Sequence, residues 1–135
     1  MNSSSLPPPV SASFLDALGR RDFEQLSGYF KPTPRARLLT PSALAMPSSA
    51  AGVGAKFRQW FGEADVFEVE QAEASAVGGC VSLRYRLHLR EHGEWYTCEQ
   101  QVYCRLQDGL IERIDLLCSG FQPAPAPAEA KELGR

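Results

Sequence analysis

The hydrophobic pattern of this chain changes its period once, near residue 65. After that point apolar and polar side chains alternate, which is typical of strands that bury one face. Pairs that contain glycine, at 78–79, 92–93 and 108–109, divide this half of the chain and predict tight hairpin turns. We therefore expect an antiparallel meander. Its four strands are residues 65–79, 80–90, 94–107 and 109–121.

The first half of the chain has helical periodicity instead, in three short segments. The first ends near Gly19, and the second follows Asp22, which can cap a helix, and stops before Pro32. The third runs from Val53 to Glu63. Their apolar faces are made by Phe14, Leu15 and Leu18; by Phe23, Leu26, Tyr29 and Phe30; and by Val53, Phe57, Trp60 and Phe61.

The order of these elements predicts an α+β fold. Residues 36–40 form a short expected strand between the second and third helices, and the four-stranded meander follows the third helix. Helices grouped before the strands favour a curved antiparallel sheet with all three helices on one face. We expect one domain at residues 10–121, because residues 1–9 are rich in Ser and Pro, and residues 122–135 in Pro and Ala, which is typical of flexible tails.

The alternation also predicts which strand residues face each other. If Arg90 pairs with Trp95 across a short loop, then Tyr85 lies opposite Gln100 on the face that meets the helices. The apolar residues of the strand at 80–90 belong to the same inner face. They are Val81, Leu83, Leu87 and Leu89.

The last hairpin allows two registers. A three-residue turn with a bulge at Gly109 keeps Ile114, Leu116 and Cys118 inside, whereas a two-residue turn brings Arg113 and Asp115 inside. We prefer the first register because it buries fewer charges. It places Asp115 near Gln101 on the outer face, with Arg113 near Tyr103, and makes Cys98 and Cys118 near neighbours on the inner face.

Charge and hydropathy exclude several kinds of partner. A formal net charge of -2 provides no basic field for a polyanion, so we expect no nucleic-acid partner. No apolar run approaches the roughly 20 residues of a transmembrane helix, so we expect no membrane partner. The opening residues, MNSSSLPPPVSAS, do not resemble a secretory signal, and we expect a cytoplasmic location.

Cysteine and histidine spacing does not predict a metal site. The four cysteines lack any C-x-x-C spacing, and the two histidines lie together in one expected hairpin. We therefore expect no metal and no cofactor, and we interpret the cysteines as buried strand residues. The four cysteines are Cys80, Cys98, Cys104 and Cys118, and the two histidines are His88 and His92.

Several motifs in this order resemble the nuclear-transport-factor-2-like (NTF2-like) superfamily, which includes SnoaL-like polyketide cyclases and ketosteroid isomerases. They are FLDALGRRDFEQLSGYF, a strand that ends in Thr40-Pro41, a helix that ends in Arg-Gln-Trp-Phe, and DGLIERIDLL. The resemblance covers about residues 10–121. It implies a cone-shaped, cystatin-like fold with a ligand pocket between the helices and the concave sheet. It also implies a homodimer through the outer face of the sheet.

The catalytic residues of the isomerases do not carry over. Those enzymes use an Asp base and an oxyanion hole made by a Tyr and a protonated Asp. The corresponding positions here are Phe14 for the Tyr, Thr40 for the base, and Gln100 or Val102 for the protonated Asp. Ketosteroid isomerisation by that mechanism is therefore not expected. SnoaL-like cyclases rely on an acid of the inner sheet, and the nearest candidate is Asp115.

The first functional hypothesis is a SnoaL-like protein that binds a small, mostly apolar metabolite. Tyr85, Tyr96 and Gln100 supply sparse polar groups on an apolar wall, as a small-molecule pocket requires, although ordinary hydrogen-bonded core is the alternative interpretation. An isomerase, cyclase or hydratase reaction in this pocket is left open. The predicted pocket consists of Tyr29, Phe30, Trp60, Phe61, Tyr85, Tyr96, Cys98, Gln100 and Cys118.

The second hypothesis is a non-catalytic dimerisation or protein-interaction module. The outer face of the meander is polar with aromatic residues interspersed, which suits contact with a second copy. The residues expected on this dimer face are Arg84, Arg86, Glu99, Gln101 and Tyr103.

Overall fold

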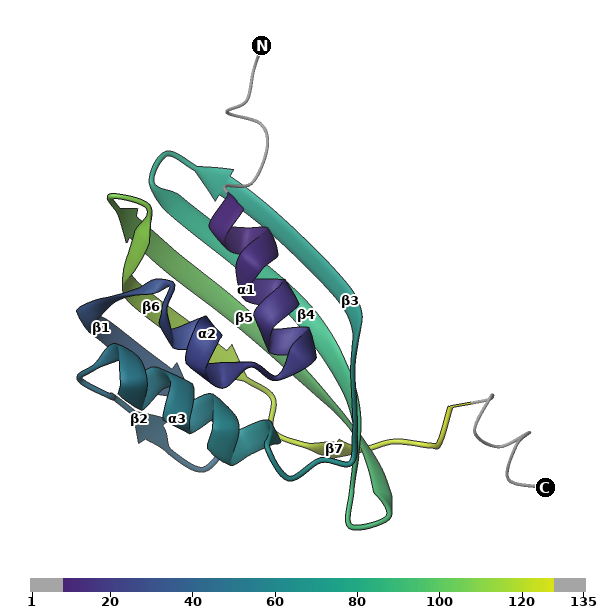
Figure 1. Ribbon diagram of the computed structural model, residues 1–135. Coiled ribbons are helices and arrows are strands. Elements are labelled where there is room, and N and C mark those ends of the chain that lie inside the picture. The colour runs from purple at the N-terminus through teal and green to yellow at the C-terminus, as the bar shows by residue number, and fades with distance from the viewer. Residues whose placement is uncertain (1–8, 128–135) are drawn as a thin grey trace.

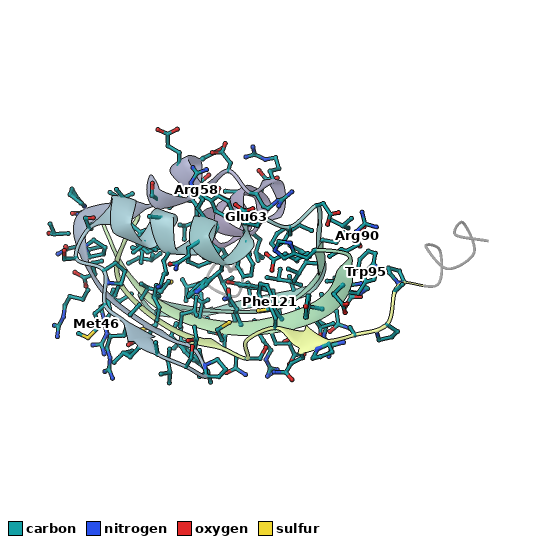
Figure 2. The ribbon with its side chains drawn as sticks, turned by 90° about the horizontal axis from the view of Figure 1, so that it is seen from below. Met46, Arg58, Glu63, Arg90, Trp95 and Phe121 are labelled. Atoms are coloured by element: carbon teal, nitrogen blue, oxygen red, sulfur yellow. The ribbon has the colours of Figure 1, made fainter. Side chains whose placement is uncertain are left out.

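Four long strands form the meander that the alternation predicts (Figure 1). Successive strands pair antiparallel, and the helices lie over the concave face of the curved sheet (Figure 2). The computed structural model describes residues 9–127. The four strands are β3 (Val66–Val77), β4 (Cys80–Glu91), β5 (Glu94–Gln107) and β6 (Leu110–Cys118).

The predicted register between β4 and β5 is confirmed. Arg90 pairs with Trp95, and Tyr85 pairs with Gln100, as the short loop requires. The inner face is buried, since Leu87 and Leu89 are both 0% exposed. Side chains of this face make one hydrophobic core with the helices.

The last hairpin keeps the expected residues inside, but by a different route. Asp108 and Gly109 have φ angles of 55° and 80°, which is the geometry of a two-residue turn. The register then shifts, because Leu106 pairs with Ile111 while Arg105 pairs with Arg113. The bulge therefore lies in β6 between Ile111 and Arg113. It restores the inward direction of Ile114 and Leu116, which a two-residue turn alone would have turned outward.

This bulge corrects the predicted neighbours on the outer face. Asp115 pairs with Tyr103 rather than with Gln101, which pairs with Leu117. Ile114, at 0% exposure, and Leu116, at 3%, are inside as expected.

The sheet is mixed rather than wholly antiparallel. β1 (Phe30–Leu39) runs parallel to β6, and the two-residue β2 (Leu44–Ala45) pairs antiparallel with β1 at the edge. The order across the main sheet is β2-β1-β6-β5-β4-β3. The prediction of an antiparallel sheet is therefore wrong for β1. Its partner β6 comes last in the meander, and the alternation of residues within a strand does not specify which distant strand it pairs with.

The three helices are α1 (Pro9–Arg20), α2 (Phe23–Ser27) and α3 (Ala50–Phe61). Asp22 caps α2 as predicted, by accepting a hydrogen bond from the Gln25 backbone N–H at 3.1 Å. Ser49 caps α3 by accepting from the Gly52 N–H at 3.0 Å, so that helix begins before the expected Val53. A capping side chain satisfies backbone N–H groups that a helix leaves unpaired.

The second helix is shorter than its apolar spacing predicts. Phe30, expected on its face, is instead the first residue of β1 and pairs with Ile111. Pro32 and Pro34 then lie inside β1, where the pairing is irregular between Phe30 and Arg35. Proline has no N–H to donate, so it is tolerated in a strand where the ladder is interrupted.

A short strand follows residue 121, the expected end of the domain. Gln122 and Pro123 form β7, which pairs with Thr97 and Tyr96 of β5. At the other end, Pro9 opens α1, while the rest of the expected N-terminal tail lies outside the described residues. None of the described helices has the length and apolar character needed to cross a membrane.

Candidate functional site

The residues predicted to line a pocket pack into the hydrophobic core or against it. Tyr85, Cys98 and Gln100 are 2%, 0% and 0% exposed, so they belong to the packed core. The others are buried or half-buried on the same inner side of the fold. They are Phe30, Phe61, Cys118, Tyr29, Trp60 and Tyr96.

An aromatic residue that was not among the predicted pocket residues, Phe121, packs between α3 and β5. Phe121 stacks on Phe61 with 6.0 Å between the ring centroids, and it lies 5.6 Å from the ring of Tyr96. Figure 2 shows Phe121 between the helices and the sheet. In the sequence, Phe121 is a single aromatic residue beside the Pro/Ala-rich stretch, at the point where we expected the domain to end.

An open cleft lies beside this aromatic residue, and we call it the mouth cleft. It has a volume of about 390 Å³ and lies between the end of β1, the end of α3 and the segment after β6. Two of the predicted pocket residues, Trp60 and Cys118, border it. The complete lining is Thr40, Pro41, Ser42, Trp60, Cys118, Ser119, Gly120, Phe121 and Gln122.

A buried polar pair lies directly behind the mouth cleft. The Tyr85 hydroxyl donates to Gln100 Oε1 at 2.6 Å, and Gln100 pairs across the strands with Cys118, a residue of the cleft wall. Burial raises the pKa of Tyr85 well above its ordinary value, so the phenol remains a neutral donor. The amide nitrogen of Gln100 is buried and has no hydrogen-bond partner within the part of the chain that the structure describes.

The three positions that correspond to the isomerase residues carry no acid or base. Phe14 is 1% exposed and makes an edge-to-face contact with Phe57. The Thr40 hydroxyl is used in a local turn, where it accepts from the Ala43 N–H at 3.2 Å. Val102 is a buried apolar side chain.

The catalytic candidate Asp115 lies on the outer face of the sheet, away from the helices. Its carboxylate accepts a hydrogen bond from Arg113 Nε at 2.9 Å on the outer face. The bulge in β6 decides this orientation, because it turns Ile114 and Leu116 inward on either side of Asp115. Asp115 is therefore not an acid of the interior.

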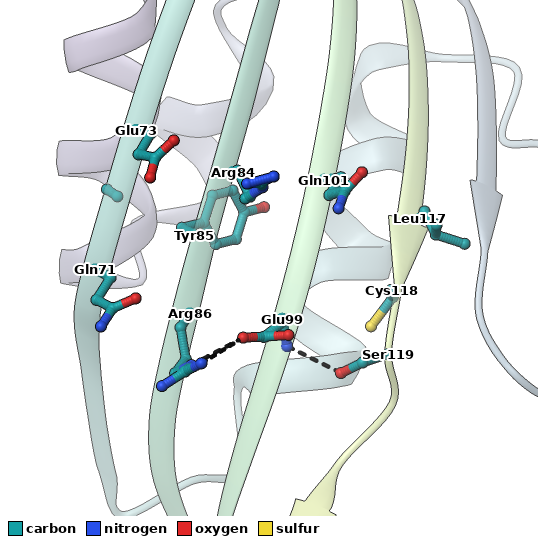
Figure 3. Close-up of a pocket in the computed structure, with 11 residues that line it drawn as sticks. Gln71, Glu73, Arg84, Tyr85, Arg86, Glu99, Gln101, Leu117, Cys118 and Ser119 are labelled. Carbon is teal, nitrogen blue, oxygen red and sulfur yellow. Dashed lines mark hydrogen bonds and ion pairs between the residues drawn. The ribbon is translucent and has the colours of Figure 1, made fainter.

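The outer face carries the residues predicted for dimer contact. Arg86 and Glu99 form an ion pair of 2.8 Å across β4 and β5, and Arg84 lies opposite Gln101 (Figure 3). These four residues border an open cleft of about 600 Å³, the outer cleft. Tyr103, the fifth predicted residue, is 58% exposed on the same face.

Among residues 9–127, no group of three or more His, Cys, Asp or Glu side chains is placed to hold a metal ion. In the interior, the sulfur atoms of Cys98 and Cys118 are 3.5 Å apart. Both are free thiols, as the predicted register allowed.

Comparison with solved structures identifies the fold. An NTF-2 like protein of unknown function from Burkholderia xenovorans LB400 is 14% identical, with a TM-score of 0.62 over 91% of this chain and 88% of the other. An M. tuberculosis LEH-like epoxide hydrolase is 16% identical, with a TM-score of 0.63 over 82% and 80% of the two chains. A hypothetical protein with a ketosteroid isomerase-like fold from Catenulispora acidiphila, in complex with trimethylamine, is 11% identical, with a TM-score of 0.70 over 84% and 87%.

No family model and no curated protein matches the sequence. The likeness is therefore one of structure, and it confirms the predicted NTF2-like fold.

Proposed function

Because this chain has the NTF2-like fold, we propose that it binds a small, largely apolar molecule at the mouth cleft, with a hydrogen-bond acceptor directed toward Gln100. The observation that carries this proposal is the unpartnered Gln100 amide nitrogen behind the cleft wall. Burying such a donor without a partner costs about 1–3 kcal/mol. Native proteins rarely leave that cost uncompensated.

The walls of the cleft suit such a ligand. Trp60, Pro41 and Phe121 supply apolar surface, and the Gln100 amide behind the cleft wall supplies the hydrogen-bond donor that would orient the ligand. A carbonyl or ether oxygen is the acceptor that an amide N–H recognises. The segment that bears Phe121 is held to β5 on both sides of that residue, by hydrogen bonds between Ser119 and Glu99 and by the short β7.

The proposal is binding rather than a reaction. The residues that line the cleft include hydroxyls and a thiol but no carboxylate and no imidazole. General acid-base catalysis near neutral pH most often uses those missing groups. The Catenulispora protein in complex with trimethylamine is an example of this fold with a small organic molecule.

We expect acetophenone, a small apolar ketone, to show saturation transfer from the wild-type protein in ligand-observed NMR. In Gln100→Leu the affinity should fall about tenfold, because the interior donor is removed. The matched control is Gln101→Leu, which changes the neighbouring residue on the outer face and should bind as the wild type does. No binding by the wild type, or equal binding by both variants, would refute the proposal.

An exposed apolar strip on the outer face favours a second function, homodimerisation. Leu39 pairs with Leu117 on one side and with Leu44 on the other, and these side chains are 45%, 51% and 47% exposed. Tyr103 adds a fourth apolar group, beside a smaller hollow that all four residues line. Contiguous exposed apolar surface of this kind marks an interaction site. We infer that a second copy covers it, with Arg86 and Glu99 nearer the rim.

Leu117→Glu should convert the dimer to a monomer, since it would bury an unpaired carboxylate at the centre of the strip. Sedimentation velocity at micromolar concentration measures the change. Ala51→Glu provides the control, because Ala51 is exposed on α3, which covers the opposite, concave face of the sheet, and the substitution should leave the dimer intact. A wild-type protein that sediments as a monomer contradicts this second function.

A further inference from the structure

Two free thiols meet where β5 and β6 lie side by side. The sulfur atoms of Cys98 and Cys118 are 3.5 Å apart. Cys118 pairs with Gln100, so the two cysteines are diagonal neighbours on adjacent antiparallel strands. A disulfide requires about 2.05 Å between its sulfur atoms. The pair is therefore in contact, and a shift of the order of an ångström separates it from a bond.

The two thiols differ in access and in environment. Cys98 is 0% exposed, whereas Cys118 is 6% exposed and borders both the mouth cleft and the outer cleft. The Gly120 backbone N–H donates to Cys118 Sγ at 3.4 Å. The contact with Cys98, and after it the hydrogen bond from the Gly120 N–H, lower the pKa of the Cys118 thiol against the effect of burial. The Cys98–Cys118 contact and burial raise the pKa of Cys98.

The backbone around Cys118 can accommodate the remaining approach. Cys118 is the last residue of β6, and Ser119 and Gly120 lie outside any strand. Gly120 has a φ of 78°, a conformation that glycine adopts without steric cost. Closing the bond therefore needs a displacement at the end of one strand, while Cys98 remains fixed inside β5.

We propose that Cys118 and Cys98 form a dithiol couple that a low-molecular-weight disulfide oxidises through Cys118. The Cys118 thiolate attacks one sulfur of the small disulfide, whose S–S bond breaks to release one thiolate, which takes up a proton from water. Cys98 then gives up its proton and attacks the Cys118 sulfur of the mixed disulfide, releasing the second small thiol. Two protein thiols and one small disulfide thus become one protein disulfide and two small thiols. This inference does not depend on the proposed ligand or on dimerisation.

The test uses the full chain with Cys80→Ser throughout, because Cys80 is exposed and would react independently. The protein is incubated with hydroxyethyl disulfide, quenched with acid, alkylated under denaturing conditions, and analysed by intact mass and peptide mapping. We expect the C80S protein to lose two thiols and to yield a peptide that joins Cys98 to Cys118. Adding Cys98→Ser should instead trap a single hydroxyethyl adduct on Cys118.

Two further variants make the result specific. Adding Cys118→Ser should slow all thiol loss at least about tenfold, because the remaining thiols are buried and protonated. Adding Cys104→Ser should change nothing, since Cys104 is a buried thiol of the same strand whose pKa burial raises to about 12. Circular dichroism of each variant establishes that it is folded.

The pairing itself distinguishes a folded couple from random oxidation. In urea the shorter Cys98–Cys104 loop should close more readily than the Cys98–Cys118 loop. In the folded protein the order should be reversed. The proposal is overturned if the folded C80S protein forms no Cys98–Cys118 disulfide, or if C80S/C118S loses thiols as fast as C80S.

Discussion

Phe61→Ala should lower the free energy of unfolding by about 3–5 kcal/mol. Phe61 is 0% exposed at the end of α3, and its ring has aromatic neighbours on several sides. It stacks on Phe121, lies 5.2 Å from Phe67 and 5.9 Å from Trp60, measured between ring centroids. Alanine would leave a cavity between α3, β3 and the segment after β6, and these elements cannot all move together to fill it.

Urea denaturation followed by tryptophan fluorescence measures this loss, because Trp60 lies beside the substituted ring. Met46→Ala is the control. Met46 is 65% exposed, so its truncation should change stability by no more than about 0.5 kcal/mol. A loss below about 1 kcal/mol for Phe61→Ala would contradict the packing described at the mouth of the cone.

The buried Tyr85–Gln100 pair should show strong non-additivity. Tyr85→Phe alone leaves both the oxygen and the nitrogen of the Gln100 amide without a hydrogen-bond partner. Gln100→Leu alone leaves the buried Tyr85 hydroxyl without its acceptor. Each single substitution should therefore cost about 1–3 kcal/mol. The double variant removes both polar groups and should be close to the wild type in stability, because an apolar core needs no hydrogen-bond partner.

A double-mutant cycle in urea gives the coupling energy directly. We expect the double variant to be more stable than either single variant. Additive losses would mean that the two side chains do not depend on each other. The double variant should still bind acetophenone about tenfold more weakly than the wild type. The cycle therefore separates stability, which recovers, from ligand binding, which does not.

The strands and their faces could be predicted because each depends on neighbours close in sequence. Alternation in residues 80–90 and the short loop before Trp95 were enough to place Tyr85 opposite Gln100. Asp22 likewise acts on the helix that begins at the next residue. Hairpin partners and helix caps are local, so the chain itself brings them together.

The candidate site depended on contacts between distant segments. The Asp108-Gly109 pair indicated a tight turn, but the expected three-residue turn with a bulge at Gly109 was wrong. The turn has two residues, and burial of Ile114 against the helices selects the compensating bulge before Arg113. Phe121 enters the site by stacking on Phe61, sixty residues earlier in the chain. That contact buries apolar surface of both rings, and no pattern among neighbouring residues in the sequence predicts it.

The sequence alone determined the α+β class, the meander, its inner face and the absence of isomerase residues at Phe14 and Thr40, because period, turn chemistry and residue identity are local properties. Tertiary structure alone decided that β1 lies parallel to β6, that Asp115 faces outward, and that Phe121 packs between α3 and β5. These features depend on which distant segments of the chain bury their apolar surfaces against each other. The change of period near residue 65 therefore predicts the sheet, whereas the space enclosed by that sheet is a property of the folded chain.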